Sequence, residues 1–164
     1  MRTPPTTGLL DTDTVILLSR IADPSVLPQH PVISAITLAE LSVGPLVATD
    51  EGQRAARLAH LQQAEADFDA LPFDAAAARS FGQVAASLRR SGRKPAARAY
   101  DAMIAAVAIA NGLPLYTCNE QDFAGIDDLT VVGVPHPDHR RGSPRRAREW
   151  LENRHPPRSL RRRG

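Results

Sequence analysis

Short apolar runs alternate with longer segments of helical periodicity along the first 135 residues of the chain. Brief apolar runs bounded by turn-forming residues are typical of buried strands, whereas apolar positions spaced by three and four residues are typical of helices. The pattern predicts strands near residues 8–10, 32–36, 71–73, 113–117 and 130–134. Strands that alternate with helices favour a mostly parallel sheet covered on both faces, so we predict an α/β fold.

The helix that follows Asp101 is predicted to be buried on most sides. Five apolar residues leave this helix almost no polar face: Met103, Ile104, Val107, Ala108 and Ile109. A helix without a polar face usually lies inside the core. Asn111 and Gly112 then predict its end, because glycine readily adopts the left-handed backbone conformation of a helix C-terminus.

Two other helices are predicted to be amphipathic. Residues 50–68 place Leu58, Leu61 and Phe68 on one face and leave Arg57 facing water. Apolar positions spaced by three and four residues follow Asp74, the expected cap of the next helix. These predicted core positions are Ala78, Phe81, Ala85 and Leu88.

Two helix starts lie close to acidic residues in the first quarter of the chain. Asp13 or Thr14 is a candidate cap for a helix over residues 15–21. Thr37 is a candidate cap for a second helix, with Glu40 three residues further on. This is the spacing of a capping box, so Glu40 has a purely structural interpretation as well as a functional one.

Composition narrows the class of protein. A chain of 164 residues is long enough for one domain with a substantial core. Cys118 is the only cysteine, so no internal disulfide can form, which suits a reducing compartment. Neither a signal peptide nor a membrane-spanning run is visible. We therefore expect a soluble cytoplasmic protein with no membrane contact.

The net charge of +2 hides an uneven distribution of charge along the chain. Residues 1–135 carry ten basic and fifteen acidic residues, whereas residues 136–164 carry ten arginines and only three acids. The second segment is also poor in apolar residues and rich in proline, a composition that does not support a core. We predict a folded domain over 1–135 and a flexible Arg-rich tail over 136–164.

Four acidic residues occupy positions from which they could converge. Asp11 and Asp122 follow predicted strands, and Glu40 and Asp101 lie near predicted helix starts. In an open α/β sheet, the carboxyl ends of the strands border one crevice. The chain has a single lysine, and no arginine is an obvious partner, so Mg²⁺ or Mn²⁺ is the expected counter-charge. Ordinary capping and surface positions are the alternative, while the scattered histidines do not predict a zinc site.

Four segments in this order carry a family resemblance. They are Leu9-Leu-Asp11-Thr-Asp13-Thr14, Ser34-Ala-Ile-Thr-Leu-Ala-Glu40, Tyr100-Asp101-Ala-Met and Thr117-Cys-Asn119-Glu-Gln-Asp122. Together they resemble the PIN-domain ribonucleases, most closely the VapC toxins of type II toxin–antitoxin pairs, over about residues 8–134. The resemblance implies a three-layer α/β/α domain and Mg²⁺- or Mn²⁺-dependent RNA endonuclease activity. It also implies a homodimer that a small cognate antitoxin inhibits.

The resemblance implies a role for each acidic position. Asp11 and Asp101 match the principal metal ligands, and Glu40 and Asp122 match the remaining acids, acting directly or through water. Further positions match supporting groups of the family site: Asp13, Thr117 and Asn119. Asp13 lies where the family often has asparagine, which favours a supporting role over ligation.

RNA would be repelled by the acids alone, so basic residues are expected around the site, since phosphate contacts supply most sequence-independent affinity. The candidates for RNA binding are Arg89, Arg90, Arg93, Lys94 and Arg98. An ordinary solvated loop is the alternative interpretation of this segment.

Two rival functions fit parts of the sequence. The Asp11-Thr-Asp13 opening also looks like that of haloacid-dehalogenase-like phosphatases, with Asp11 as a covalent nucleophile and Asp127-Asp128 as the late acidic pair. That chemistry requires a well-placed lysine, and Lys94, in a loop that contains glycine and proline, is a poor candidate. A second rival is an inactive PIN-like protein that only binds nucleic acid or a partner, and the complete acidic set argues against it.

Overall fold

Five parallel strands form the centre of the computed structural model, which describes residues 6–138. The strands are β1 (Thr7–Leu10), β2 (His30–Ser34), β3 (Ala70–Leu71), β4 (Leu115–Thr117) and β5 (Val131–Gly133). Their spatial order is β3-β2-β1-β4-β5, and every neighbouring pair is parallel. The predicted parallel α/β architecture is confirmed, although most strands are shifted by one or two residues from the predicted ranges.

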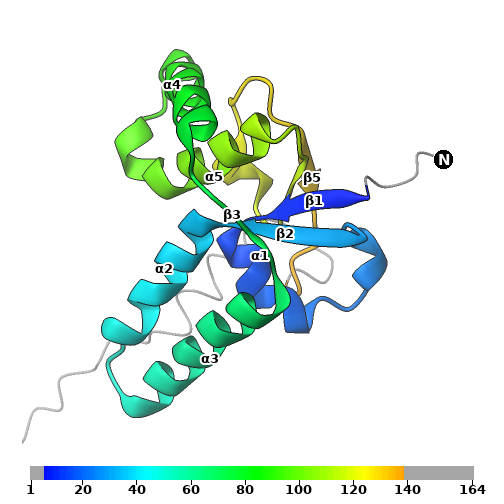
Figure 1. Cartoon of the computed structure of the whole chain (residues 1–164), viewed down its shortest axis with the longest axis vertical. Helices are drawn as coiled ribbons and strands as arrows, with labels where there is room; N and C mark the ends of the chain where they lie inside the picture. The colour runs from blue at the N-terminus through cyan, green and yellow to red at the C-terminus, as the bar shows by residue number, and fades with distance from the viewer. Residues whose placement is uncertain (1–5, 139–164) are drawn as a thin grey trace, which may run out of the picture.

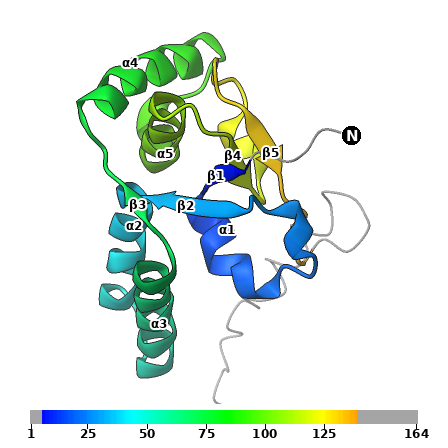
Figure 2. The ribbon, with the colours of Figure 1, turned by 45° about the vertical axis from the view of Figure 1, so that its right-hand side comes forward.

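Helices cover both faces of this sheet (Figures 1 and 2). They are α1 (Thr12–Leu17), α2 (Ala35–Leu46), α3 (Glu51–Asp67), α4 (Ala75–Arg90) and α5 (Ala99–Ala110). Short 3₁₀ segments lie at Leu18–Arg20, Pro24–Val26, Pro95–Arg98 and Glu120–Phe123. Helices α4 and α5 lie on one face, and α1 lies on the other with the α2–α3 pair, which extends away from the sheet (Figure 2). The domain therefore has three layers.

Successive residues of the central strands point to opposite faces and so belong to two separate cores. Leu9 and Leu115 pack with α4 and α5, whereas Leu10 and Tyr116 pack with residues of α1, α2 and α3. These residues are all at most 1% exposed. The two-residue period of a strand thus divides the short apolar runs between two helical layers.

The structure moves two predicted helix caps toward the N-terminus. Asp11, rather than Asp13 or Thr14, caps α1, and Ser34, rather than Thr37, caps α2. Asp11 and Ser34 have extended backbones and accept the N–H of the residue three positions later, which is the geometry of an N-cap. The predicted capping box at Glu40 is therefore not formed. The predicted cap at Asp74 is confirmed.

Three predicted burial assignments are wrong. Ala78 is exposed and Ala77 is buried instead, because α4 packs through a stripe that includes Val84. Leu58 is 41% exposed, since α3 contacts the core mainly near its C-terminal end. Arg57 does not face water freely but is half-buried against α2.

The sheet order reverses at β1, which has β2 on one side and β4 on the other. A crevice forms at such a switch point, beyond the carboxyl ends of the strands. Asp11 directly follows β1 and Thr117 is the last residue of β4, so both lie at this position. Helix α2 also begins directly after β2 and carries Glu40.

The division into a domain and a tail stays a prediction, because residues 139–164 lie outside the described part of the chain. Asp138, near the start of the predicted tail, pairs with Arg20 of the domain. Within residues 6–138, the longest helices lack the length and apolar character that crossing a bilayer requires.

Candidate active site

Asp11 is the most buried acid of the site, with 4% of its surface exposed. Its Oδ1 accepts the backbone N–H of Thr14 at 2.9 Å, and its Oδ2 accepts the hydroxyl of Thr117 at 2.6 Å. The first contact is the helix cap of α1, and the second links β1 to β4. The carboxylate is therefore held in one orientation at the sheet edge, next to the positive end of a short helix.

Glu40 is attached to the same edge through threonines. The hydroxyl of Thr12 donates to Oε1 of Glu40 at 2.7 Å, and the Thr12 and Thr37 hydroxyls are 3.1 Å apart. Thr12 follows Asp11 in the chain, and Thr37 lies one turn before Glu40 on α2. This pair of hydroxyls thus fixes the position of Glu40 relative to Asp11.

Asp101 and Asp122 are joined by an arginine. Asp101 lies in the first turn of α5, and Asp122 lies in the 3₁₀ segment after β4. Nη1 of Arg98 is 2.5 Å from Oδ1 of Asp122 and 3.8 Å from Oδ2 of Asp101. The side-chain amide of Asn119 donates to the other oxygen of Asp122 at 2.8 Å. The expectation that no arginine accompanies the acids is therefore wrong, because Arg98 reaches them from the turn before α5.

The acids share one electrostatic environment. Burial raises the pKa of Asp101 to about 7, the charges of Asp122, Glu40 and Asp11 add to this effect, and Arg98 opposes it. Burial also raises the pKa of Asp11 and of Glu40, against the hydrogen bonds that each receives from a threonine. One arginine thus leaves an excess of negative charge, which is the condition that attracts a cation.

Two of the predicted supporting residues, Thr117 and Asn119, belong to the hydrogen-bonded network at the sheet edge. The third, Asp13, lies at the rim of the site. The backbone N–H of Asn119 donates to the Thr117 hydroxyl at 2.9 Å, so Thr117 links Asn119 to Asp11. Asp13 is exposed on α1. Its pKa is raised by desolvation and by Asp122 and lowered by His136.

The donor set suits a hard divalent cation, because carboxylate and hydroxyl oxygens are the ligands that Mg²⁺ and Mn²⁺ prefer. Within residues 6–138, no three side chains of His, Cys, Asp or Glu are close enough to form a ready-made metal site. The hydrogen bonds from Thr12, Thr117 and Arg98 orient three of the carboxylates, one each on Glu40, Asp11 and Asp122. Binding one ion through three of these acids therefore requires their side chains to come closer together.

The five candidate RNA-binding cations do not form one exposed rim. Arg90 pairs with Asp127 at 2.5 Å, and Arg93 donates to the carbonyl of Gln121 at 2.7 Å. Arg98 lies inside the acidic site. Only Arg89 and Lys94 of this set are exposed without a partner in the described part of the chain.

The sequence alone did not single out Thr12 and Thr14 as part of the site. Thr14 is fully buried, gives its N–H to Asp11 and accepts the backbone N–H of Cys118 at 3.0 Å. Thr12 bonds Glu40. The contact between Asp11 and Thr14 could have been predicted, because their spacing is that of a helix cap and the third residue after it.

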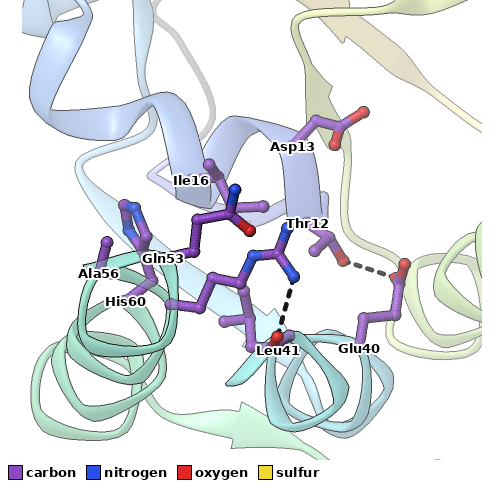
Figure 3. Close-up of a pocket in the computed structure, with 10 residues that line it drawn as sticks. Thr12, Asp13, Ile16, Glu40, Leu41, Gln53, Ala56 and His60 are labelled. Atoms are coloured by element: carbon purple, nitrogen blue, oxygen red, sulfur yellow. Dashed lines mark hydrogen bonds between the residues drawn. The ribbon is translucent and has the colours of Figure 1, made fainter. Parts of the chain in front are cut away.

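A cavity of about 400 Å³ opens beside the acidic cluster, between α1, α2 and α3 (Figure 3). Its wall includes Thr12, Asp13 and Glu40 of the site. The remaining lining residues are Ile16, Leu41, Gly44, Gln53, Ala56, Arg57 and His60. The acidic site thus continues into a pocket with both apolar and basic walls.

The second acidic pair of the phosphatase interpretation is not at this site. Asp127 and Asp128 line a separate pocket next to α4, where Asp127 bonds Arg90 and its N–H donates to Ser87. Lys94 is exposed. The constellation that a phosphatase with Asp11 as nucleophile requires is therefore not assembled.

The PIN domain profile matches residues 12–129. The chain is 39% identical over 136 residues to Ribonuclease VapC5 of Mycobacterium tuberculosis, which covers 82% of this chain and 98% of that protein. Its structure is similar to VapBC-5, a toxin–antitoxin system member from Mycobacterium tuberculosis, with a TM-score of 0.68 and 38% identity over 79% of this chain and 100% of that one. It is also similar to FitAcB from Neisseria gonorrhoeae, with a TM-score of 0.61 and 28% identity over 80% and 98% of the two chains.

The matched segment begins directly after Asp11 and includes Glu40, Asp101 and Asp122. It spans more than half of the chain, and the relative from Mycobacterium tuberculosis is covered almost completely. Sequence identity and fold agree. The chain therefore belongs to the PIN domain family.

Proposed function

We propose that this protein is an Mg²⁺- or Mn²⁺-dependent endoribonuclease that acts as the toxin of a type II toxin–antitoxin pair. One observation carries the proposal: acids from distant segments lie at the switch point of the sheet, where Thr117 joins Asp11 to β4 and Arg98 joins Asp101 to Asp122. The names of its relatives support the substrate class, since they are ribonucleases of the VapC type. Membership of the PIN family supports the same chemistry.

Asp11 and Asp101 are the proposed principal ligands, with Glu40 and Asp122 contributing directly or through water. A divalent ion bound there would activate water as the nucleophile and offset negative charge on the scissile phosphate. No covalent nucleophile from the protein is needed for this reaction.

The surrounding residues orient the acids. Thr117 and the N–H of Thr14 occupy one oxygen each of Asp11, which fixes the direction of its remaining lone pairs. Thr12 does the same for one oxygen of Glu40. Arg98 balances part of the charge of Asp122 and Asp101, and it is the predicted RNA-contacting cation that lies within reach of a phosphate at the site.

Protein partners are proposed on separate grounds. Three large apolar side chains near the end of α2 are exposed by 47%, 80% and 61%, namely Val43, Leu46 and Val47. Clustered exposed apolar residues are typical of protein interfaces. The solved relative VapBC-5 is a member of the VapBC family of toxin–antitoxin systems, which supports a cognate antitoxin as one partner. We propose a homodimer as the active form, as in the resemblance above.

Cleavage of labelled single-stranded RNA by the purified protein tests the function. We expect cutting with Mg²⁺ or Mn²⁺, none with EDTA, and at least about a hundredfold loss in Asp11→Asn and Asp101→Asn, because each removes a charged ligand. Asp128→Asn is the matched control, since Asp128 is exposed, lies outside the cluster and has a φ of 62° that asparagine tolerates.

Circular dichroism should show that all three variants are folded. Wild-type rates in a folded Asp101→Asn protein, or cleavage that persists in EDTA, would contradict the site assignment. The toxin role is tested separately: co-expression with the product of the adjacent small reading frame should suppress cleavage and yield a co-purifying complex.

A further inference from the structure

We infer that the pocket beside the acidic cluster binds a ribonucleotide unit next to the scissile phosphate, with Arg57 contacting a phosphate of that unit. This inference rests on the proposed ribonuclease function and assigns the direction in which the RNA strand leaves the site. It also adds Arg57 to the RNA-binding residues, in a part of the chain that the sequence did not single out.

Arg57 is a half-buried cation without an acidic partner among the described residues. Four of the eight arginines within residues 6–138 do have one, among them Arg90 with Asp127 and Arg98 with Asp122. Partial burial makes an unpaired charge costly, and a guanidinium prefers the planar, bidentate oxygens of carboxylate or phosphate. Since no carboxylate of residues 6–138 pairs with Arg57, its guanidinium can bind an anionic ligand.

Contacts with Gly44 of α2 fix the position of the Arg57 side chain. Its Nη1 donates to the carbonyl of Gly44 at 3.0 Å, which ties the guanidinium on α3 to the backbone of α2. A Cβ at Gly44 would lie 3.3 Å from Cδ of Arg57, so the absence of a side chain there gives the arginine room to pass. The bond uses one N–H, and the remaining donors stay available for a ligand.

The other walls suit a nucleobase. Ile16 and Ala56 present apolar surface, and Ile16 is 37% exposed. The side chains of Gln53 and His60 lie on the α3 side of the same cavity (Figure 3) and provide hydrogen-bonding groups. An unstacked base of single-stranded RNA is held by stacking on a planar side chain and by hydrogen bonds to its edges, and the imidazole of His60 is the planar ring in this lining. The volume of about 400 Å³ lies within the range of small-ligand pockets.

The pocket is continuous with the site of the proposed reaction. Thr12, Asp13 and Glu40 line it, and Thr12 and Glu40 are hydrogen-bonded to each other at its edge. A strand whose phosphate lies over the acids therefore places an adjacent nucleotide in this cavity. Arg57 would neutralise a neighbouring phosphate that the acids repel, which favours RNA over an uncharged ligand.

RNA affinity as a function of salt concentration tests the inference. The probe is a fluorescein-labelled single-stranded RNA of mixed sequence, bound by the full chain in the Asp101→Asn background, in which cleavage is expected to stop. Arg57→Ala should weaken binding about three- to tenfold and lower the salt slope by about 0.7, the value for one phosphate contact on a single strand. Arg57→Lys should retain the slope and lose part of the affinity.

Arg54→Ala is the matched control, because Arg54 is on the same helix, is exposed and pairs with Glu51 outside the pocket. It should leave the affinity and the slope unchanged. Chemical modification of arginine in the otherwise unmutated chain gives a second measurement that needs no substitution at Arg57. Bound RNA should protect Arg57 from phenylglyoxal and leave Arg54 reactive.

The outcomes separate this inference from the proposed function. If the wild-type chain cuts RNA but Arg57→Ala binds it with unchanged affinity and slope, the pocket is not an RNA subsite, although the nuclease remains. Equal RNA protection of Arg54 and Arg57 would also overturn the inference. If the wild-type chain neither binds nor cuts RNA with Mg²⁺ or Mn²⁺, the proposed function itself fails.

Discussion

Asp101 shows how burial and like charge act together on a single carboxyl group. Its side chain is 33% exposed, yet its pKa is raised to about 7 because it lies in a desolvated position facing Asp122, Glu40 and Asp11. Arg98 reduces this effect without removing it. Near neutral pH, the site is therefore divided between a protonated form and a charged form that attracts cations.

The raised pKa of Asp101 predicts a pH-dependent stability of the metal-free protein. Between the unfolded value of 3.8 and the folded value of about 7, the folded protein binds more protons than the unfolded chain. Stability in EDTA should therefore fall as pH rises through this window, by about 1 kcal/mol after allowance for partial exposure. Urea unfolding at pH 5 and pH 8 measures the difference.

Asp101→Asn should flatten this dependence, because the amide does not titrate. The increase in the free energy of unfolding of the variant over wild type should be largest at pH 8, where the wild-type carboxylate is charged. If the metal-free wild-type protein were more stable at pH 8 than at pH 5, and Asp101→Asn did not change this, the clustered arrangement of the acids would be contradicted.

At the scale of elements, hydrogen bonds at the starts of helices place the site. The side chains of Asp11 and Ser34 cap α1 and α2, and the hydroxyls of Thr12 and Thr37 then meet. The sequence predicted the strands and most helices, because apolar runs and breakers are local signals. It did not predict these caps, because several polar residues in a row offer equivalent local choices; at Asp11 the hydrogen bond from Thr117 adds a contact from a distant strand.

The contact between β1 and β4 is a second feature at the scale of elements. It requires glycine at position 8. A Cβ there would lie 2.4 Å from Cε2 of the buried Tyr116 ring. Gly8→Ala should lower the free energy of unfolding by about 2 kcal/mol, since the ring has no room to move. Gly82 lies on the exposed side of α4 with nothing within 4 Å of a new Cβ, so Gly82→Ala should raise it by about 0.5–1 kcal/mol.

Urea denaturation of the two alanine variants measures both effects with one method. Equal effects at the two positions would show that the close approach of Gly8 to Tyr116 does not occur. Because Gly8 lies in β1, three residues before Asp11, the cleavage rate of a folded Gly8→Ala protein would also report how strongly the strand fixes the acid.

At the scale of the whole molecule, an acidic domain is followed by a basic C-terminal segment. The parallel architecture and the meeting of Asp11, Glu40, Asp101 and Asp122 at one sheet edge follow from the order of motifs in the sequence. The pairing of Arg98 with the acids and the Arg57 pocket do not, because nothing in the local sequence distinguishes these two arginines from the other arginines of the chain.

The Arg-rich segment predicts a salt-dependent contribution to RNA binding. A chain ending at residue 138 lacks ten arginines, so it should bind single-stranded RNA less tightly at low salt and with a smaller salt slope. The cleavage rate at saturating RNA should change little, since the proposed site lies in the described domain. Fluorescence anisotropy at several salt concentrations checks this, with thermal unfolding as the control for folding. Identical slopes would show that the segment does not contact RNA.

Binding of Mn²⁺ followed by titration calorimetry tests the central claim most directly, because it asks whether these acids hold one divalent ion. We predict binding by wild type at pH 8, about tenfold weaker binding at pH 6, where Asp101 must release a proton, and loss of binding in Asp101→Asn. Asp128→Asn should bind like wild type. Unchanged Mn²⁺ affinity in folded Asp101→Asn, or no binding by wild type at pH 8, would contradict the account.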